Sequence, residues 1–260
     1  MSFLGILKKV ITNNKESTLK EPQFVKEFSS ENKNILKLQE LLEEVSDEET
    51  ANNIKNNINR LYYGVMGEKN VAYELKNSHM PILVLHNLYL EFNGLTAQID
   101  FVVISEKFIL VIECKNLVGE IDINNKGEFT RIFKTSTGKV YKKEGMYSPI
   151  VQNERHLELI KDILENEGIK RSILDKAIDQ ISVVANEKAV INDRFAKEKV
   201  KKRIIKHDQL IEKMKEISRK SSISFTEETM YKISNILLKY NKEYYRKRKE
   251  ETLGGDLCES

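Results

Sequence analysis

Residues 98–115 read QIDFVVISEKFILVIECK, and this stretch decides the fold of the chain. Two runs of β-branched and apolar residues flank Glu106-Lys107, a pattern that predicts two antiparallel strands joined by a two-residue turn. With that turn at the tip, facing residues have numbers that sum to 213, so Asp100 is expected to face Glu113. Both faces are otherwise apolar, with Val102, Ile104, Ile109 and Val111 on one and Ile99, Phe101, Val103, Leu110 and Ile112 on the other. The sequence therefore predicts a buried hairpin that ends in two acids.

The expected pairing brings two carboxylates together. Facing β-carbons lie about 4.5 to 5.5 Å apart, and two carboxylates about 5 Å apart repel by about 3 kcal/mol at an effective dielectric of about 20. A divalent cation would relieve the repulsion, and carboxylates without a cluster of His or thiolate ligands favour Mg2+ or Mn2+ over zinc. Gln98 and Lys115 are expected on the same face, where Lys115 could hold or deprotonate a water, or neutralise charge on a phosphoryl group. This set of groups suits phosphodiester hydrolysis.

Two further metal ligands are candidates. Glu68 lies on the apolar stripe of an expected helix at residues 64–76 and could add a carboxylate to the metal shell. The thiol of Cys114 is expected to pack away from the site, while its carbonyl oxygen could ligate the metal. In the structural alternative, Glu68 is an acid that the helix dipole favours near a helix start.

Two candidates for substrate contact lie later in the chain. Ser148-Pro149 is a helix opening, and Gln152 and His156 lie four residues apart on the helix that follows. Both could line the cleft that holds the acids. They could equally be packing residues held by hydrogen bonds, just as an Asp and Glu-x-Lys pattern on strands can be a plain salt bridge.

Helices and strands are expected on both sides of the hairpin. Residues 1–29 are expected to form a loosely attached arm, and Ser29 or Ser30 and then Ser46 to cap two helices. The later elements are a helix at 64–76, strands at 81–92, 96–105, 107–115, 119–123 and 128–133, a polar excursion from 137, a helix from 148, a strand at 180–186 and a helix at 225–249. This order predicts an α/β fold.

The composition excludes several classes of protein. Of 260 residues 40% are hydrophobic and 32% charged, and apolar runs such as Phe108 to Ile112 are far too short to cross a bilayer. Cys114 and Cys258 give neither a disulfide framework nor a zinc spacing. The first residues do not match a secretory leader. We therefore expect a cytoplasmic protein without a membrane partner.

The net charge of +3 conceals a basic C-terminal region. Residues 193–250 hold 18 Lys and Arg against 9 Asp and Glu, a net charge of +9. The block Lys199-Val200-Lys201-Lys202-Arg203 could neutralise the phosphates of a nucleic acid, and so could a second block beside Tyr244-Tyr245, made of Arg246, Lys247, Arg248 and Lys249. The alternative is that these cations are solvated ends of helices that pack on the core.

Several motifs together resemble one known family. They are Gly67-Glu68, the run Val84 to Leu88, the run Gln98 to Val103, the run Ile112 to Gly119, and the run Ser148 to Asn153 with His156. Over about 60–190 the chain resembles the nuclease-related domain (NERD) family, which is similar to the PD-(D/E)XK nuclease superfamily. The resemblance implies a nuclease-like core of helix, three-stranded antiparallel meander, helix and strand. It also implies that Asp100, Glu113 and Lys115 form the superfamily signature and that Glu68 is the acid of the first helix.

We therefore expect three regions: an N-terminal arm and helical hairpin at 1–60, the nuclease-related core at 61–192, and a basic helical extension at 193–260. The expected activity is Mg2+- or Mn2+-dependent phosphodiester hydrolysis in DNA. Whether a homodimer cuts both strands stays open. The alternative is a non-catalytic module on the same fold that binds nucleic acid or protein.

Overall fold

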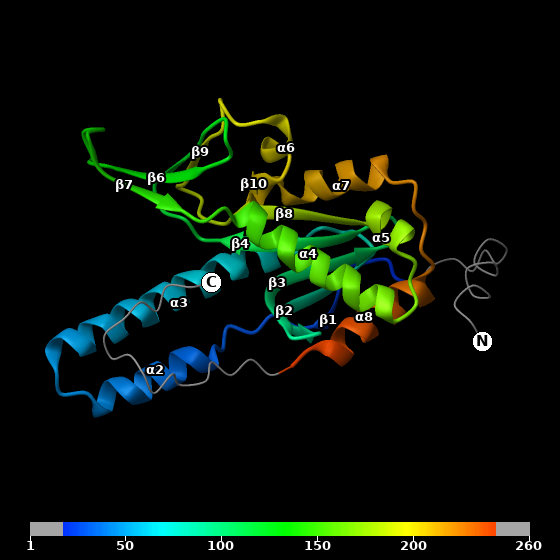
Figure 1. Cartoon of the computed structure of the whole chain (residues 1–260), viewed down its shortest axis with the longest axis horizontal. Helices are drawn as coiled ribbons and strands as arrows, with labels where there is room; N and C mark the ends of the chain where they lie inside the picture. The colour runs from blue at the N-terminus through cyan, green and yellow to red at the C-terminus, as the bar shows by residue number, and fades with distance from the viewer. Residues whose placement is uncertain (1–17, 243–260) are drawn as a thin grey trace.

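The computed structural model describes residues 18–242 and has a mixed six-stranded main sheet at its centre (Figure 1). The strands lie in the order β1 (Gln23–Lys26), β2 (Ile82–Phe92), β3 (Leu95–Ser105), β4 (Ile109–Lys115), β8 (Ile178–Val184) and β10 (Ile204–Lys206). The pairs β2–β3 and β3–β4 are antiparallel, while β1–β2, β4–β8 and β8–β10 are parallel. The predicted α/β class is confirmed.

Two tight turns make the meander β2–β3–β4. Asn93 and Gly94 both have positive φ, 50° and 77°, as the turn of a two-residue hairpin requires. The second turn places Phe101 opposite Ile112 and continues to Ile104 opposite Ile109, so facing numbers sum to 213 as predicted. The turn residues thus determine the register of the buried hairpin.

The alternation of buried faces breaks once in the meander. On β3, Ile99 lies in the same core cluster as Val102, although the prediction placed it on the opposite face with Phe101. The partner strand breaks at the same level, around Asn87, whose φ is 51°. The register between β2 and β3 is the same before and after this break. It is kept because the alternation of buried faces shifts by one residue in both strands at the same level. Asp100 stands at this break.

Helices cover both faces of the main sheet (Figure 1). One face carries α4 (Pro149–Asn166), α5 (Arg171–Ala177) and α8 (Glu227–Tyr240), and the other carries α3 (Glu48–Lys76) and α7 (Leu210–Lys220). Apolar side chains of these helices and of the strands form two clusters, one on each side of the sheet. Among residues 18–242, no helix is long and apolar enough to cross a membrane.

The N-terminal hairpin differs in detail from the prediction. The N-terminal caps are not the predicted serines. Asn32 caps α2 (Lys33–Glu44) with its amide oxygen and Asp47 caps α3 with its carboxylate, each accepting from backbone N–H groups of the first turn. The helix expected after Ser46 and the helix expected at 64–76 are one helix, because a single glycine, Gly64, costs too little to end a helix that tertiary packing supports. Part of the predicted loose arm is also ordered, since β1 pairs with β2.

The outer edge of β2 is covered by both ends of the described chain. Gln23 to Lys26 pair with its first half. Along its second half, the backbone N–H of Lys242 donates to the carbonyl of Tyr89 at 2.8 Å, and the N–H of Tyr89 donates to the side chain of Asn241 at 2.9 Å. No expectation from sequence covered this closure, because it joins residues about 150 positions apart.

A second, smaller sheet lies beside the main one, in the order β7 (Val140–Met146), β6 (Phe129–Lys134), β5 (Glu120–Ile123) and β9 (Val190–Asn192). The predicted hairpin at 119–133 is confirmed as β5 and β6. The predicted polar excursion from Thr137 is instead a strand, β7, which alternation did not reveal because it is mostly exposed and rich in lysine. Apolar residues under this sheet form a third core cluster with the start of α4.

The C-terminal region contributes to the core. It contains α6 (Glu198–Lys201), β10, a short 3-10 helix (His207–Gln209), α7 and α8. The basic block at 199–203 lies on and after α6, and Val200 packs against the third cluster. The helix expected at 225–249 ends at Tyr240. The predicted cations Arg246, Lys247, Arg248 and Lys249 lie outside the described residues.

Candidate active site

The predicted acids meet where β3 and β4 separate. The antiparallel ladder ends at Phe101 and Ile112, and beyond it Glu113 to Lys115 pair with β8. The backbone N–H of Cys114 donates instead to Oδ2 of Asp100 at 2.7 Å. The carboxylate thus replaces a missing strand partner and is held beside Glu113 by the strands themselves.

Glu113 and Lys115 form an ion pair at the same place. Nζ of Lys115 lies 2.8 Å from Oε1 of Glu113, whose side chain is only 4% exposed. Burial alone raises the pKa of Glu113, but the nearby His156 ring and the Lys115 ammonium outweigh it and bring that pKa below its usual range. Burial alone lowers the pKa of Lys115, but Glu113 and Asp100 outweigh it and raise that pKa. Both side chains are therefore charged at neutral pH.

Asp100 is destabilised in its charged form. Loss of solvent raises its pKa well above the usual range, and the charges of Glu113 and Glu68 add to this. The nearby ammonium of Lys115 only partly opposes them. When all three acids are ionised, three carboxylates therefore face one lysine, an excess of negative charge that a proton on Asp100 or a bound cation would relieve.

Glu68 reaches this group from α3 and is held by a histidine. Its Oε2 lies 2.7 Å from Nε2 of His86 on β2. His86 is 2% exposed, and its ring stacks at a tilt between Phe28 and Phe101, with centroids 4.8 and 4.9 Å away. The sequence did not assign His86 a role. A polar residue within the apolar run of β2 was the one available signal, and it did not reveal the partner 18 positions earlier.

Helix α4 contributes from the opposite face. Nδ1 of His156 lies 3.4 Å from Oε2 of Glu113, and neither atom has a hydrogen-bond partner among the described residues. Asn153, which the sequence did not single out beyond its motif, is fully buried and donates to the carbonyls of Val111 at 3.1 Å and Ile181 at 2.9 Å. This clamp fixes α4 on β4 and β8, so His156 faces Glu113.

These groups fit a small divalent cation. Within residues 18–242 no three His, Cys, Asp or Glu side chains converge tightly enough to enclose an ion on their own. Mg2+ does not need such a cage, because it keeps several waters and uses one or two carboxylates. The buried Oε2 of Glu113 makes no hydrogen bond within residues 18–242, although Nδ1 of His156 lies 3.4 Å away, so this oxygen has capacity left to bind a metal. Asp100 and Glu113 would hold the ion, while Glu68 is already engaged by His86.

The remaining predicted residues are placed differently. Gln98 does not pair with Lys115, because the ladder stops at Phe101 and Lys115 pairs with Val184. The amide of Gln98 is exposed and donates to the side chain of Asn87 at 3.2 Å. Gln152 is half-buried one turn before His156, and its side chain makes no hydrogen bond within the part of the chain described. Their expected substrate contacts stay predictions, as does the carbonyl of Cys114 as a ligand.

Burial and the charges of Asp100, Glu68 and Glu113 raise the pKa of the Cys114 thiol well above its usual range. It packs against the second core cluster, on the side of α3 and α7, as predicted. In the metal-free chain the thiol is therefore neutral.

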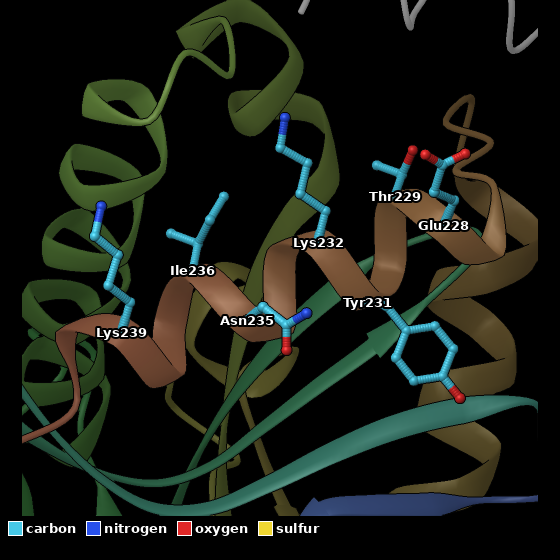
Figure 2. A pocket seen from close by; sticks show the side chains of 7 residues that line it. All are labelled: Glu228, Thr229, Tyr231, Lys232, Asn235, Ile236 and Lys239. Atoms are coloured by element: carbon cyan, nitrogen blue, oxygen red, sulfur yellow. The ribbon is translucent and has the colours of Figure 1, made fainter.

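A surface hollow lies elsewhere, along α8. Its lining residues are Glu228, Thr229, Tyr231, Lys232, Asn235, Ile236 and Lys239, and Figure 2 shows that all of them extend from this one helix. None of them belongs to the acid and lysine group at the end of β4. We therefore place the candidate site at β4 and not in this hollow.

Comparison with known proteins found one family model and one relative that resemble part of this chain. An uncharacterized protein of Bacillus anthracis is 35% identical over 107 residues, which are 40% of this chain and 48% of that protein, so the match spans about half of the relative. No solved structure matches the chain. Residues 63–185, which contain all the acids described above, match the model of the nuclease-related domain. This region of the chain is therefore similar to the nuclease-related domain (NERD) family.

Proposed function

We propose that the protein is a metal-dependent nuclease that hydrolyses phosphodiester bonds in DNA. The observation that carries the proposal is the group Asp100, Glu113 and Lys115 at the point where β3 and β4 separate, inside a nuclease-related domain. The order of α3, the meander β2–β3–β4, α4 and β8 supports a PD-(D/E)XK core. Magnesium and manganese are the metals that a site of oxygen ligands favours.

Asp100 and Glu113 would hold the ion, which when bound polarises a phosphoryl oxygen and activates a water. Because its pKa is raised, Lys115 stays an ammonium and donates hydrogen bonds instead of accepting a proton. In this proposal it orients the attacking water and neutralises charge that develops on the phosphoryl group. His156 and the pair Glu68–His86 hold the acids in position from the two faces of the sheet.

The test is cleavage of plasmid, linear duplex, single-stranded DNA and RNA with Mg2+, Mn2+ or EDTA. We expect wild-type protein to cut DNA only with metal. Lys115→Ala should lower the rate about 100-fold, the usual loss when one positioned charged donor is removed. Lys176→Ala, an exposed lysine on α5, is the matched control and should cut at the wild-type rate.

Two outcomes would contradict the proposal. A Lys115→Ala protein that cuts as fast as wild type would remove this site from the reaction. DNA binding without cleavage under any metal would favour the rival function, a non-catalytic module that retains the fold and binds nucleic acid.

A further inference from the structure

Strands β6 and β7 pair at one edge of the smaller sheet, and this pair, here called the β6–β7 ribbon, has a basic surface. Residues 129–146 contain five Lys or Arg and one Glu, a net charge of +4. Lys139 and Lys143 are exposed and take part in no ion pair within residues 18–242. In β7, Tyr141 is 65% exposed, far more than an aromatic ring needs if it only packs. The ribbon therefore presents free cations and an open ring together.

The ring of Tyr141 belongs to an ordered group of aromatic and cationic side chains. Its centroid lies 6.2 Å from that of Phe133 on β6. The guanidinium of Arg131 lies 4.9 Å from the Phe133 centroid, and the ammonium of Lys142 lies 5.8 Å from it. Both cations lie within the range of a cation–π contact with Phe133. Tyr141 thus rests against a supported partner while the rest of its ring stays in solvent.

The ribbon leaves the same end of the main sheet as the candidate active site. Lys115 ends β4, and β5 begins at Glu120 after a short link. β7 ends at Met146, and α4, which carries His156, begins at Pro149. Figure 1 shows β6 and β7 extending past the end of β4. A strand bound along the ribbon would therefore lead toward the acids.

We infer that the β6–β7 ribbon binds a single-stranded segment of nucleic acid and feeds it to the proposed active site. The inference rests on the proposed nuclease function. Lys139 and Lys143 contact phosphates, and Tyr141 stacks on a base. Single strands fit better than duplex because only an unstacked base offers its face to a side chain, and alternating cations and rings are how such strands are bound without sequence preference.

The test measures binding in EDTA, so that no cleavage occurs. The probe is a labelled oligothymidylate, with a matched DNA duplex and heparin as competitors. Tyr141→Ala should weaken single-strand binding about 5-fold to 100-fold, the range for loss of one stacked base. Tyr141→Phe keeps the ring and should bind almost as wild type. Lys139→Gln with Lys143→Gln should lower the slope of log affinity against log salt by about 1.4, at about 0.7 per phosphate contact on a single strand.

Matched controls carry the same changes elsewhere. Tyr73→Ala removes a ring that is 66% exposed on α3, and Lys170→Gln with Lys176→Gln removes two exposed charges beside and on α5. These control proteins should bind as wild type. Both the controls and the ribbon variants should melt at the wild-type temperature, because all the changed side chains are exposed.

Two other outcomes would overturn the inference. Ribbon variants that keep wild-type affinity and salt slope would place strand binding elsewhere. A lysine effect that is equal for oligothymidylate, duplex and heparin, with no effect of Tyr141→Ala, would make the ribbon a general polyanion surface. Because binding is read without metal, a protein that never cuts DNA could still pass this test, and an active nuclease could still fail it.

Discussion

At the scale of single residues, Asp100 combines two roles. Its carboxylate takes the N–H that a strand would otherwise pair, and it does so beside Glu113 and Glu68. The first role favours the folded chain, while the second raises the pKa of Asp100 and costs stability when the group is charged. An asparagine at this position would keep the hydrogen bond and lose the charge, so it separates the effects of the two roles.

Asp100→Asn should therefore make the metal-free protein more stable at neutral pH. The native pKa of Asp100 lies above its unfolded value of about 3.9, so the native state binds the proton more tightly and wild-type stability falls as pH rises through that window. The variant lacks this loss, so its advantage should vanish below about pH 4 and grow as pH rises above it. Thermal melts across pH measure the difference.

Two measurements control this prediction. Asp208→Asn, on an exposed acid, should not change the melting temperature. Millimolar Mg2+ or Mn2+ should raise the melting temperature of wild type and not of Asp100→Asn, because only a site that binds metal transfers binding energy to folding. A wild-type protein that ignores both metals would contradict the metal site.

The sequence predicted the residues that local pattern can reveal. The turn at Glu106 predicted the register from Phe101 opposite Ile112 to Ile104 opposite Ile109, but the ladder stops one step short of the expected pair Asp100 and Glu113. His86 and Asn153 did not follow, because each acts on a partner from another element that no local spacing identifies. Gln98 was misplaced for a third reason, the break in alternation at Asp100.

At the scale of elements, α3 positions Glu68 by a close approach to the end of β4. A β-carbon at Gly67 would lie 2.8 Å from Cβ of Asn116 and 3.2 Å from Cβ of Ala185. The side chain of Asn116 in turn donates to the carbonyl of Tyr63 at 2.6 Å. Gly67 therefore permits the contact that brings the next residue, Glu68, to the acids.

Two glycines on this helix should respond to alanine in opposite directions. Gly67→Ala should destabilise the protein by about 1 to 3 kcal/mol, because the added carbon overlaps its neighbours. Gly64→Ala meets nothing within 4 Å and should stabilise by about 0.8 to 1 kcal/mol through helix propensity alone. Urea denaturation measures both, and each variant is the control for the other. Equal effects of the two changes would show that α3 does not press on β4.

The helices and long strands were predictable because their apolar spacing is strong, as in β2 and β3. The start of α4 was also predictable, since the hydroxyl of Ser148 caps it and Pro149 opens it. Strands β1 and β7 were not, because β1 has only four residues, which are at most partly buried, and β7 is largely exposed, so both are strands only through pairing with a neighbour.

At the scale of the whole molecule, the core does not end where the matched domain ends. Leu210 and Met214 of α7, and Ile233 and Leu237 of α8, are fully buried against the main sheet. Their strand neighbour β10 extends that sheet beside β8. The boundary predicted at 192 follows the change in charge along the chain. The buried side chains of α7 and α8 pack in the same core clusters as residues before that boundary.

A chain that ends at Asn192 should therefore fail to fold cooperatively, because it exposes the apolar surfaces that α7 and α8 cover. Thermal unfolding followed by circular dichroism should show a broad change or aggregation. A chain that ends at Lys242 keeps every described element and should melt in one sharp transition. A sharp transition in the shorter chain would contradict this expectation and make 193–260 a true extension.

The closure of β2 by residues 23–26 and 241–242 has a consequence for how the protein fails. Together they occupy the outer backbone of an eleven-residue apolar strand, which would otherwise offer a template for pairing with a second chain. Proteolytic loss of either end would leave half of that template open, and loss of both would expose a surface suited to cross-β stacking. Protection against fibril growth in this protein therefore depends on two segments that meet only in the folded chain.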